Sequence, residues 1–229
     1  MRKTVLFDLD DTLLDFKKAE NVAIKRMLAA LDIPPTEEIA ARYSEINDAQ
    51  WKLLEKGLFT REQILTRRFR LLFEELGVER SDEEAWHTYE QMLGEGHYFL
   101  PGAVELLETL SPIYDLYLVS NGTASVQDRR IESAGIARYF KAIFISQRVG
   151  VNKPAKEFFD RCFATLPDFR REDAIIVGDS LTSDILGGRN AGIATCWFNP
   201  HHKPPRADIP ADYEITELAE LPPLLKKIW

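Results

Sequence analysis

The 229-residue sequence predicts an α/β protein that combines a doubly wound, Rossmann-like parallel sheet with a large helical insertion. Three observations lead to this fold class. Five short segments are apolar at almost every position, which is typical of parallel strands covered on both faces. Helical patterns separate these segments, as in repeated βαβ units. One long span after the first segment has helical spacing and contains no good strand.

The expected core elements alternate along the chain. The strands are Thr4–Leu9, Leu116–Val119, Ala142–Ile145, Ala174–Val177 and Ile193–Phe198. The helices are Ala103–Leu110, Ala124–Ala134, Lys156–Ala164 and Thr182–Asn190, followed by a last helix, Glu217–Ile228. Because a helix stands between successive strands, each connection is long enough to cross over the sheet, and neighbouring strands are predicted to be parallel.

The helical insertion is predicted to span residues 16–97, so the α/β core consists of residues 1–15 and 98–229. Within the insertion, apolar residues recur at the three- and four-residue spacing of a helix face, as from Leu65 to Leu76. Proline and glycine residues divide the insertion into separate helices. These breaks lie at Pro34-Pro35, Gly57, Gly77 and Gly94–Gly96.

The composition indicates which binding partners and which cellular compartment to expect for this protein. The formal net charge of −8 argues against nucleic acid polymers and anionic membranes, because both require a basic surface. No apolar run has the length of a membrane span, and Asp8 interrupts the first apolar segment too early for a secretory leader. Cys162 and Cys196 lie in apolar segments and are interpreted as buried free thiols. We expect a cytoplasmic protein, monomeric or homodimeric, that acts on a small molecule.

Four polar clusters stand at the ends of predicted strands. They are Asp8, Asp10 and Thr12; Ser120 and Asn121; Lys153 and Pro154; and Asp179, Ser180 and Asp184. Each cluster alone has a structural explanation, which is a turn, a helix cap or, for Lys153, a solvated charge. Pro154 can occupy the first turn of a helix and leave Lys153 at its positive end. Together they bring carboxylates and an ammonium group to the edge where open α/β sheets place ligands. The combination indicates a catalytic site.

These clusters resemble the motifs of the haloacid dehalogenase superfamily, most members of which are phosphatases. The matching segments read FDLDDTL, VSNGT, NKP and GDSLTSD, and they cover residues 1–14 and the chain from about residue 98. The insertion at residues 16–97 matches the position of the α-helical cap domain in one subfamily. Its segment WKLLEKGLFTREQILTRRF is similar to the caps of YjjG-type pyrimidine 5′-nucleotidases.

The resemblance implies a role for each motif residue. Asp8 is the nucleophile, and Mg²⁺ is held by Asp8, the backbone carbonyl of Asp10 and Asp179. Asp184 does not bind the metal directly and acts on the metal-bound waters or on Lys153. The phosphate is bound by Lys153, Ser120 and the amide of Asn121. Asp10 is the general acid and base. The chemistry is consistent, because a carboxylate is ionised at neutral pH and cations must offset its repulsion from a phosphate.

The preferred function is hydrolysis of a phosphate monoester through an aspartyl-phosphate. Dehalogenation is disfavoured because a halide needs no acid, whereas Asp10 supplies one. A nucleoside 5′-monophosphate is the preferred substrate, with a sugar phosphate or phosphoglycolate as the alternative. A sugar-phosphate mutase, a phospho-aspartate regulatory module and a non-catalytic binding scaffold remain open.

Substrate selection is expected to depend on the insertion, where the sequence is less informative. Phe16 and Trp51 could stack on a base, although aromatic residues at helical spacing more often serve packing. Arg67, Arg68 and Arg70 are interpreted as part of a solvated face, because acidic residues surround them. His201 and His202 are expected in an exposed loop.

Overall fold

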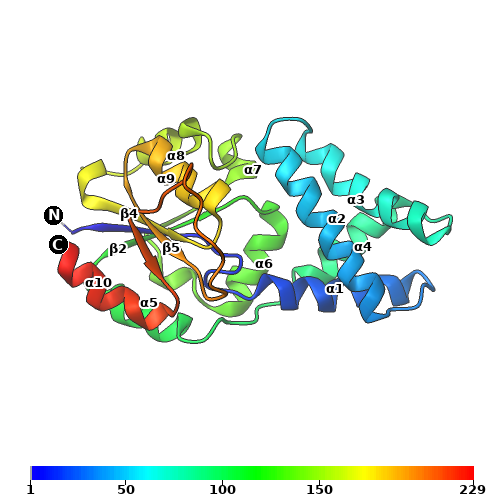
Figure 1. Cartoon of the computed structure of the whole chain (residues 1–229). Helices are drawn as coiled ribbons and strands as arrows, with labels where there is room; N and C mark the ends of the chain where they lie inside the picture. Colours follow the sequence, from blue (N-terminus) through cyan, green and yellow to red (C-terminus); the bar gives the residue numbers. More distant parts are fainter. Residues whose placement is uncertain (1) are drawn as a thin grey trace.

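The computed structural model describes residues 2–229, in which a six-stranded sheet lies between helices and four further helices form a layer beside it (Figure 1). The strand order is β3-β2-β1-β4-β5-β6, and all five pairs are parallel. The strands are β1 Thr4–Phe7, β2 Asp115–Ser120, β3 Ala142–Ile145, β4 Ala174–Gly178, β5 Ala194–Phe198 and β6 Tyr213–Ile215. The predicted doubly wound parallel sheet is confirmed.

Helices cover both faces of the sheet, because the strands carry apolar side chains on both faces. Val5 and Phe7 face one apolar cluster, which includes α5 (Ala103–Leu110), α10 (Leu221–Ile228) and Ile131 of α6 (Ala124–Ala134). Leu6 points to the opposite cluster, with α8 (Lys156–Phe163) and α9 (Leu186–Ala191). The order of strands reverses at β1, and a ligand crevice is expected where β1 and β4 end.

The segment after β1 forms four helices with an apolar core of their own. They are α1 Phe16–Ala30, α2 Glu37–Glu55, α3 Arg61–Leu76 and α4 Asp82–Leu93. Tyr43, Phe69 and Tyr89 meet at its centre, with ring centroids 5.3–5.5 Å apart. Figure 1 shows this layer at the end of the molecule opposite both termini. We refer to these four helices as the helical layer.

The helices of this layer begin at residues that the sequence marks. Asp15, Thr36, Thr60 and Ser81 each accept a hydrogen bond from a backbone N–H of the first turn. Thr60 and Gln63 form a reciprocal capping box. The two chain segments that join the layer to the sheet run side by side, since the Asp15 N–H donates to the Tyr98 carbonyl at 2.7 Å.

Several predicted bounds are wrong for local reasons. β1 ends at Phe7 instead of Leu9, because Leu13 and Leu14 donate to the Leu9 carbonyl and close a loop. Pro154 does not lie in a first helical turn, since α8 begins at Lys156. The predicted helix Thr182–Asn190 is a π-helical segment, η3 (Leu181–Ile185), followed by α9.

The sequence patterns did not predict some short elements, and they predicted others as part of a longer helix. The last helix is preceded by a 3₁₀ turn, η4 (Leu218–Glu220), and β6 was not predicted because three residues are too few for a periodic signal. The remaining short helices are η1 Ala137–Tyr139, α7 Ser146–Val149 and η2 Arg171–Asp173. Cys162 and Cys196 are buried and free, as predicted. Over residues 2–229, no helix combines the length and the apolar character needed to cross a bilayer.

Candidate active site

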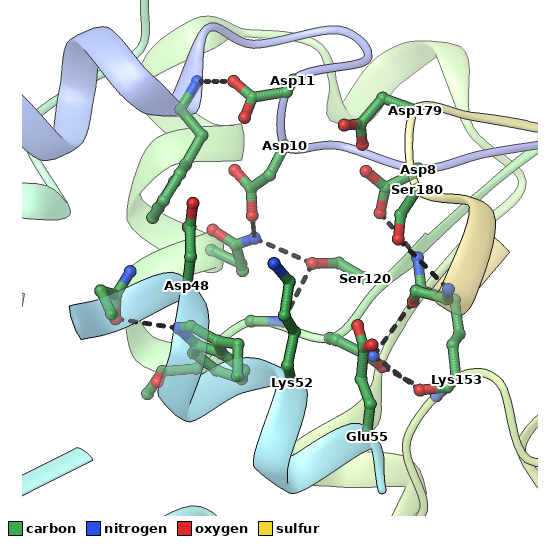
Figure 2. Close-up of a pocket in the computed structure, with 18 of the residues that line it drawn as sticks. Asp8, Asp10, Asp11, Asp48, Lys52, Glu55, Ser120, Lys153, Asp179 and Ser180 are labelled. Atoms are coloured by element: carbon green, nitrogen blue, oxygen red, sulfur yellow. Dashed lines mark hydrogen bonds and ion pairs between the residues drawn. The ribbon is translucent and has the colours of Figure 1, made fainter. Parts of the chain in front are cut away.

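The four polar clusters line one cavity of about 370 Å³ between the carboxyl edge of the sheet and the helical layer. Asp8 follows β1, Ser120 ends β2, and Asp179 follows β4. Figure 2 shows these residues and Lys153 facing the same space, with Asp48, Lys52 and Glu55 of α2 opposite them. A cavity of this size falls within the range of small-molecule sites.

Lys153 is the centre of the polar floor. Its Nζ donates to Asp8 Oδ1 at 2.6 Å, to Asp184 Oδ1 at 2.7 Å and to the Val119 carbonyl at 2.8 Å. The side chain is 1% exposed. Burial by itself would lower the pKa of Lys153, but Asp184 and Asp8 outweigh burial and raise this pKa. The ammonium group is therefore charged at neutral pH and joins two carboxylates.

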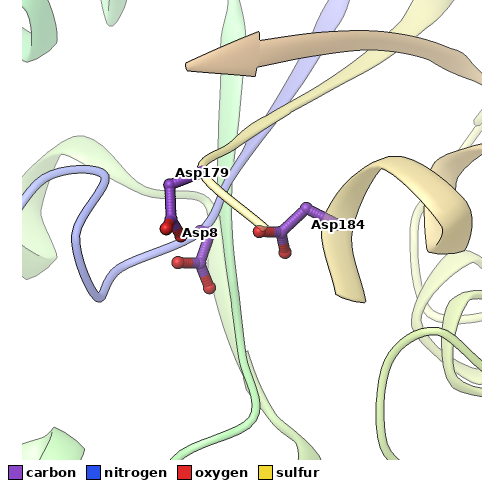
Figure 3. Close-up of side chains that lie close together, drawn as sticks. All are labelled: Asp8, Asp179 and Asp184. Atoms are coloured by element: carbon purple, nitrogen blue, oxygen red, sulfur yellow. The ribbon is translucent and has the colours of Figure 1, made fainter. Parts of the chain in front are cut away.

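Three carboxyl groups converge beside Lys153. Oxygen atoms of Asp8, Asp179 and Asp184 lie within 4.8 Å of one another (Figure 3). Burial, then the charges of Asp184 and Asp10, raise the pKa of Asp8 to about 8, although Lys153 opposes them. Burial and the charges of Asp184 and Asp8 also raise the pKa of Asp179 well above its usual value.

This cluster fits a divalent cation. Three ionised carboxylates and one ammonium group leave two negative charges in a buried place, which is unfavourable without further positive charge. All the side-chain ligand atoms are oxygens, the donor type that Mg²⁺ prefers. The charge and the donor set therefore suit Mg²⁺.

Two small residues hold the cluster in place. Thr12 Oγ1 donates to Asp8 Oδ2 at 3.4 Å and accepts from the Asp179 N–H at 3.2 Å. Gly178 lets Asp184 approach the end of β4, because a Cβ at this position would lie 2.4 Å from Asp184 Cγ. The Ser180 N–H donates to Asp184 Oδ2 at 3.1 Å. A larger residue than glycine at position 178 would displace this carboxylate.

Asp10 lines the same cavity as Asp8, but it has different partners. Arg130 Nη1 donates to Asp10 Oδ1, and Gln127 Nε2 donates to Asp10 Oδ2 at 2.7 Å. Gln127 Nε2 also reaches Ser120 Oγ at 2.8 Å. Sequence reasoning missed both partners. The available signal was that Gln127 and Arg130 lie on the apolar face of α6, with Val126 and Ile131.

Asn121 and Ser120 are placed beside the acidic cluster. Asn121 Nδ2 donates to the Lys153 carbonyl at 2.9 Å, and Asn121 Oδ1 accepts from the Lys153 N–H at 2.8 Å. The Asn121 side chain thus fixes the backbone that carries Lys153. Ser120 Oγ accepts from the Gly122 N–H at 3.1 Å and lines the cavity.

Arg61 and Glu55 of the helical layer contact residues of the α/β core. Arg61 Nη2 donates to the Asn121 carbonyl at 2.9 Å, to Ser146 Oγ at 2.7 Å and to Asn152 Oδ1 at 2.7 Å. Thr182 Oγ1 donates to Glu55 Oε2 at 2.9 Å. These contacts connect the layer directly with the loops that carry the polar clusters.

The interpretation of Arg67, Arg68 and Arg70 as one solvated face is wrong for Arg68. Arg68 is buried and lines the cavity, whereas Arg70 is exposed and Arg67 is half-buried against Gln50. The acidic neighbours that suggested a solvated face lie on the outer side of α3. Sequence spacing alone did not separate this inner arginine from the outer ones.

The aromatic candidates occupy the wall of the cavity. Phe16 and Trp51 both line it, and Trp51 Nε1 donates to Asn47 Oδ1 at 3.1 Å. The Arg61 guanidinium lies 5.4 Å from the Trp51 ring centroid. Similarly, the Arg130 guanidinium lies 5.8 Å from the Phe16 ring centroid. His201 and His202 are exposed, as expected.

Comparisons with known proteins agree with this geometry. Residues 2–192 match a family described as haloacid dehalogenase-like hydrolase. The chain is 41% identical to HAD-hydrolase YfnB of Bacillus subtilis, over 96% of this chain and 93% of that protein. A crystal structure of YfnB, described as bound to magnesium and as revealing interdomain movement, gives a TM-score of 0.94 and covers 98% of both chains.

Two further relatives have a described activity. The chain is 35% identical to the pyrimidine 5′-nucleotidase PynA of Streptococcus pneumoniae, over 98% of this chain and 95% of that protein. It is 34% identical to the pyrimidine 5′-nucleotidase YjjG of Escherichia coli, over 97% of each. Both similarities therefore include the residues of the sheet edge and those of the helical layer.

Proposed function

Because this chain belongs to the haloacid dehalogenase-like hydrolases, we propose that it is a Mg²⁺-dependent phosphatase that hydrolyses nucleoside 5′-monophosphates through a phosphorylated Asp8. One observation carries the proposal: Asp8 lies at the floor of the cavity, in contact with Lys153 and beside Asp179 and Asp184. A nucleophilic carboxylate, an ammonium group and a cation-binding cluster thus share one space.

Asp8, Asp179 and the backbone carbonyl of Asp10 would hold the Mg²⁺ ion, with Asp184 beside them. When bound, the cation supplies positive charge that offsets the repulsion between a carboxylate and a phosphate. Lys153 is already charged and hydrogen-bonded to Asp8, so it holds the nucleophile while it contributes further positive charge. Ser120 and the amide of Asn121 would donate hydrogen bonds to the phosphate oxygens.

The reaction has two steps on residues of this chain. In the first, an Asp8 oxygen forms a bond to phosphorus, the ester P–O bond breaks, and Asp10 gives a proton to the leaving alkoxide. In the second, Asp10 takes a proton from water, the water oxygen bonds to phosphorus, and the P–O bond to Asp8 breaks. Arg130 and Gln127 fix the direction of the Asp10 carboxyl group for both steps.

The choice of substrate rests on the relatives and on the cavity wall. PynA and YjjG are pyrimidine 5′-nucleotidases, and this chain aligns with both along nearly its whole length. Phe16, Trp51, Leu65 and Leu93 give the cavity an apolar side that suits a nucleoside better than the small acid of phosphoglycolate. A sugar phosphate remains the second candidate, because the polar floor would bind it equally well.

Residues 16–97 are proposed to act as a cap domain over a core formed by residues 1–15 and 98–229. The proposal is supported by the separate apolar core of the helical layer and by the adjacent position of its two connections. Opening of the cap would admit the substrate, and Arg61 would return to its three acceptors on closure.

The decisive experiment is Asp8→Asn, assayed by phosphate release from uridine 5′-monophosphate and p-nitrophenyl phosphate. We expect turnover of both to fall by about a thousandfold or more, because the nucleophile is lost. Chelation of Mg²⁺ should abolish activity of the native sequence, and Mg²⁺ should restore it. Asp168→Asn, at an exposed turn far from the site, is the matched control.

Acid quenching during turnover, followed by peptide mapping, should place the phosphoryl group on Asp8. Full activity in Asp8→Asn, or phosphate on another residue, would contradict the mechanism. A phosphorylated Asp8 that persists for minutes without product release would favour the regulatory module. Hydrolysis of p-nitrophenyl phosphate without hydrolysis of nucleotides would leave the phosphatase intact and reject the nucleotide substrate.

A further inference from the structure

We propose that Arg68 and Glu90, on the helical wall of the cavity, form a subsite that recognises the hydrogen-bonding edge of a pyrimidine base such as uracil. The inference rests on the proposed phosphatase function and adds to it the residues that select the leaving group. Both residues line the cavity that Asp8 and Lys153 close from the other side.

Glu90 has an unused acceptor in a buried position. The residue is 9% exposed, and its Oε1 has no hydrogen-bond partner within the described part of the chain. A buried polar atom without a partner is unfavourable and rare, so such an atom beside a cavity indicates a missing ligand group. The group that would satisfy Glu90 Oε1 is a hydrogen-bond donor, such as an N–H.

Arg68 is a buried donor whose orientation is fixed. Its Nε donates to the Leu65 carbonyl at 3.1 Å, and its Nη1 donates to Asn47 Oδ1 at 2.8 Å. Asn47 is itself held, because its Nδ2 donates to Glu20 Oε1 at 2.7 Å. The Arg68 guanidinium lies 4.9 Å from the ring centroid of Tyr89. These contacts engage Nε and Nη1 and leave Nη2 as the nitrogen that can serve a ligand.

The two residues together define the chemistry of the ligand. Neither is paired with the other, so a ligand that satisfies both must present a donor to Glu90 and an acceptor to Arg68. Uracil has such an edge, because its N3–H lies between two carbonyl oxygens. Leu65 and Leu93 line the same cavity and would contact the ring. A sugar without a base offers neither the flat apolar ring nor this edge.

A purely structural role for Glu90 makes a different prediction. Arg61 Nη1 is also buried without a partner, and the negative charge of Glu90 acts on Arg61. If Glu90 served only to support Arg61 at the cap–core contact, its replacement would affect every substrate to the same extent. Base recognition requires an effect that depends on the base.

The first test uses the native sequence and needs no variant. Uridine 5′-monophosphate is compared with its 3-methyl derivative, in which the N3–H donor is replaced by a methyl group. We expect kcat/KM to be at least tenfold lower for the methylated nucleotide, because Glu90 would lose its donor and meet a methyl group. Equal kcat/KM values for the two nucleotides would overturn the proposal while leaving a nucleotidase in place.

The second test uses Glu90→Met and Arg68→Met, with ribose 5-phosphate as the substrate that lacks a base. For both variants we expect the ratio of kcat/KM for uridine 5′-monophosphate to that for ribose 5-phosphate to fall tenfold or more. Glu83→Met, on the exposed side of α4, should keep the ratio within twofold of the native value.

In Glu90→Met, the preference for the unmethylated nucleotide should also fall to threefold or less. Equal losses on both substrates would overturn the proposal in favour of a structural role. Absence of uridine 5′-monophosphate hydrolysis by the native sequence would instead reject the proposed nucleotide substrate itself, so the two failures are distinguishable.

Discussion

At the scale of single residues, the floor of the cavity carries more negative charge than Lys153 can neutralise. The pKa of Asp8 is raised to about 8, mainly by burial and then by neighbouring carboxylates. A carboxyl group whose pKa is higher in the folded state makes the native protein bind more protons than the unfolded chain. Its contribution to the free energy of unfolding therefore decreases as pH rises from about 4 to about 8.

Asp179→Asn tests this charge imbalance, because it removes one negative charge with little change of size. In the absence of metal at pH 8, we expect the variant to unfold at a higher temperature than the native sequence. Mg²⁺ at about a hundred times its dissociation constant stabilises a protein by about 2.7 kcal/mol, and the variant should lose most of this gain.

Thermal unfolding with a chelator and with Mg²⁺ measures both effects. Asp168→Asn serves again as the control and should follow the native sequence in both conditions. A variant that melts lower without metal and keeps the whole Mg²⁺ shift would show that Asp179 neither repels its neighbours nor binds the ion.

At the scale of elements, helix α6 connects the acid–base residue with the helical layer. Arg130 of this helix is 0% exposed. It pairs with Asp10, donates through Nε to the Gly96 carbonyl at 2.9 Å, and lies over the ring of Phe16. Phe16 is the first residue of α1, and Gly96 lies in the segment that follows α4 and leads back to the sheet. The position of Asp10 is therefore tied to the position of the cap.

Arg130→Met should impair the step that needs proton transfer more than the others. For uridine 5′-monophosphate, whose alkoxide needs a proton, we expect kcat to fall about a hundredfold. For p-nitrophenyl phosphate, whose leaving group needs no acid, the fall should be at least tenfold smaller. Arg129→Met, on the exposed side of α6, is the control. Equal losses of kcat on both substrates would indicate that Arg130 only stabilises the fold.

At the scale of the whole molecule, packing protects both cysteines. Cys162 lies in the cluster between the sheet and α8, and Cys196 lies on β5 in the opposite cluster. Burial raises the pKa of each thiol to about 12. Because the thiolate is the reactive form, the native protein should react with a disulfide reagent at pH 8 about a thousandfold more slowly than a free cysteine.

Both thiols should become available in denaturant, where the packing is lost. The reagent's colour change measures the number and rate of reacting thiols in each state. Rapid reaction of one thiol in the native protein would mean that one of the two apolar clusters opens readily.

The sequence by itself determined the parts that depend on local patterns. Continuous apolar runs predicted five of the six strands, because parallel strands must be apolar on both faces. The polar residues that end these strands indicated one shared edge, and the structure brings Asp8, Lys153, Asp179 and Asp184 together there. The division at residues 15 and 98 and the roles of these residues stay predictions.

Only the tertiary structure decided which residues complete the cavity. Asp10 and Arg130 are 120 positions apart, and nothing local in either segment names the other as its partner. Arg68 resembles a solvated arginine in sequence, and its role depends on burial by helices that the pattern does not place. Periodicity indicates which face of a helix is apolar, but long-range packing decides which surface lies opposite that face. A buried charged residue such as Arg68 or Arg130 takes its role from the groups that this opposing surface provides.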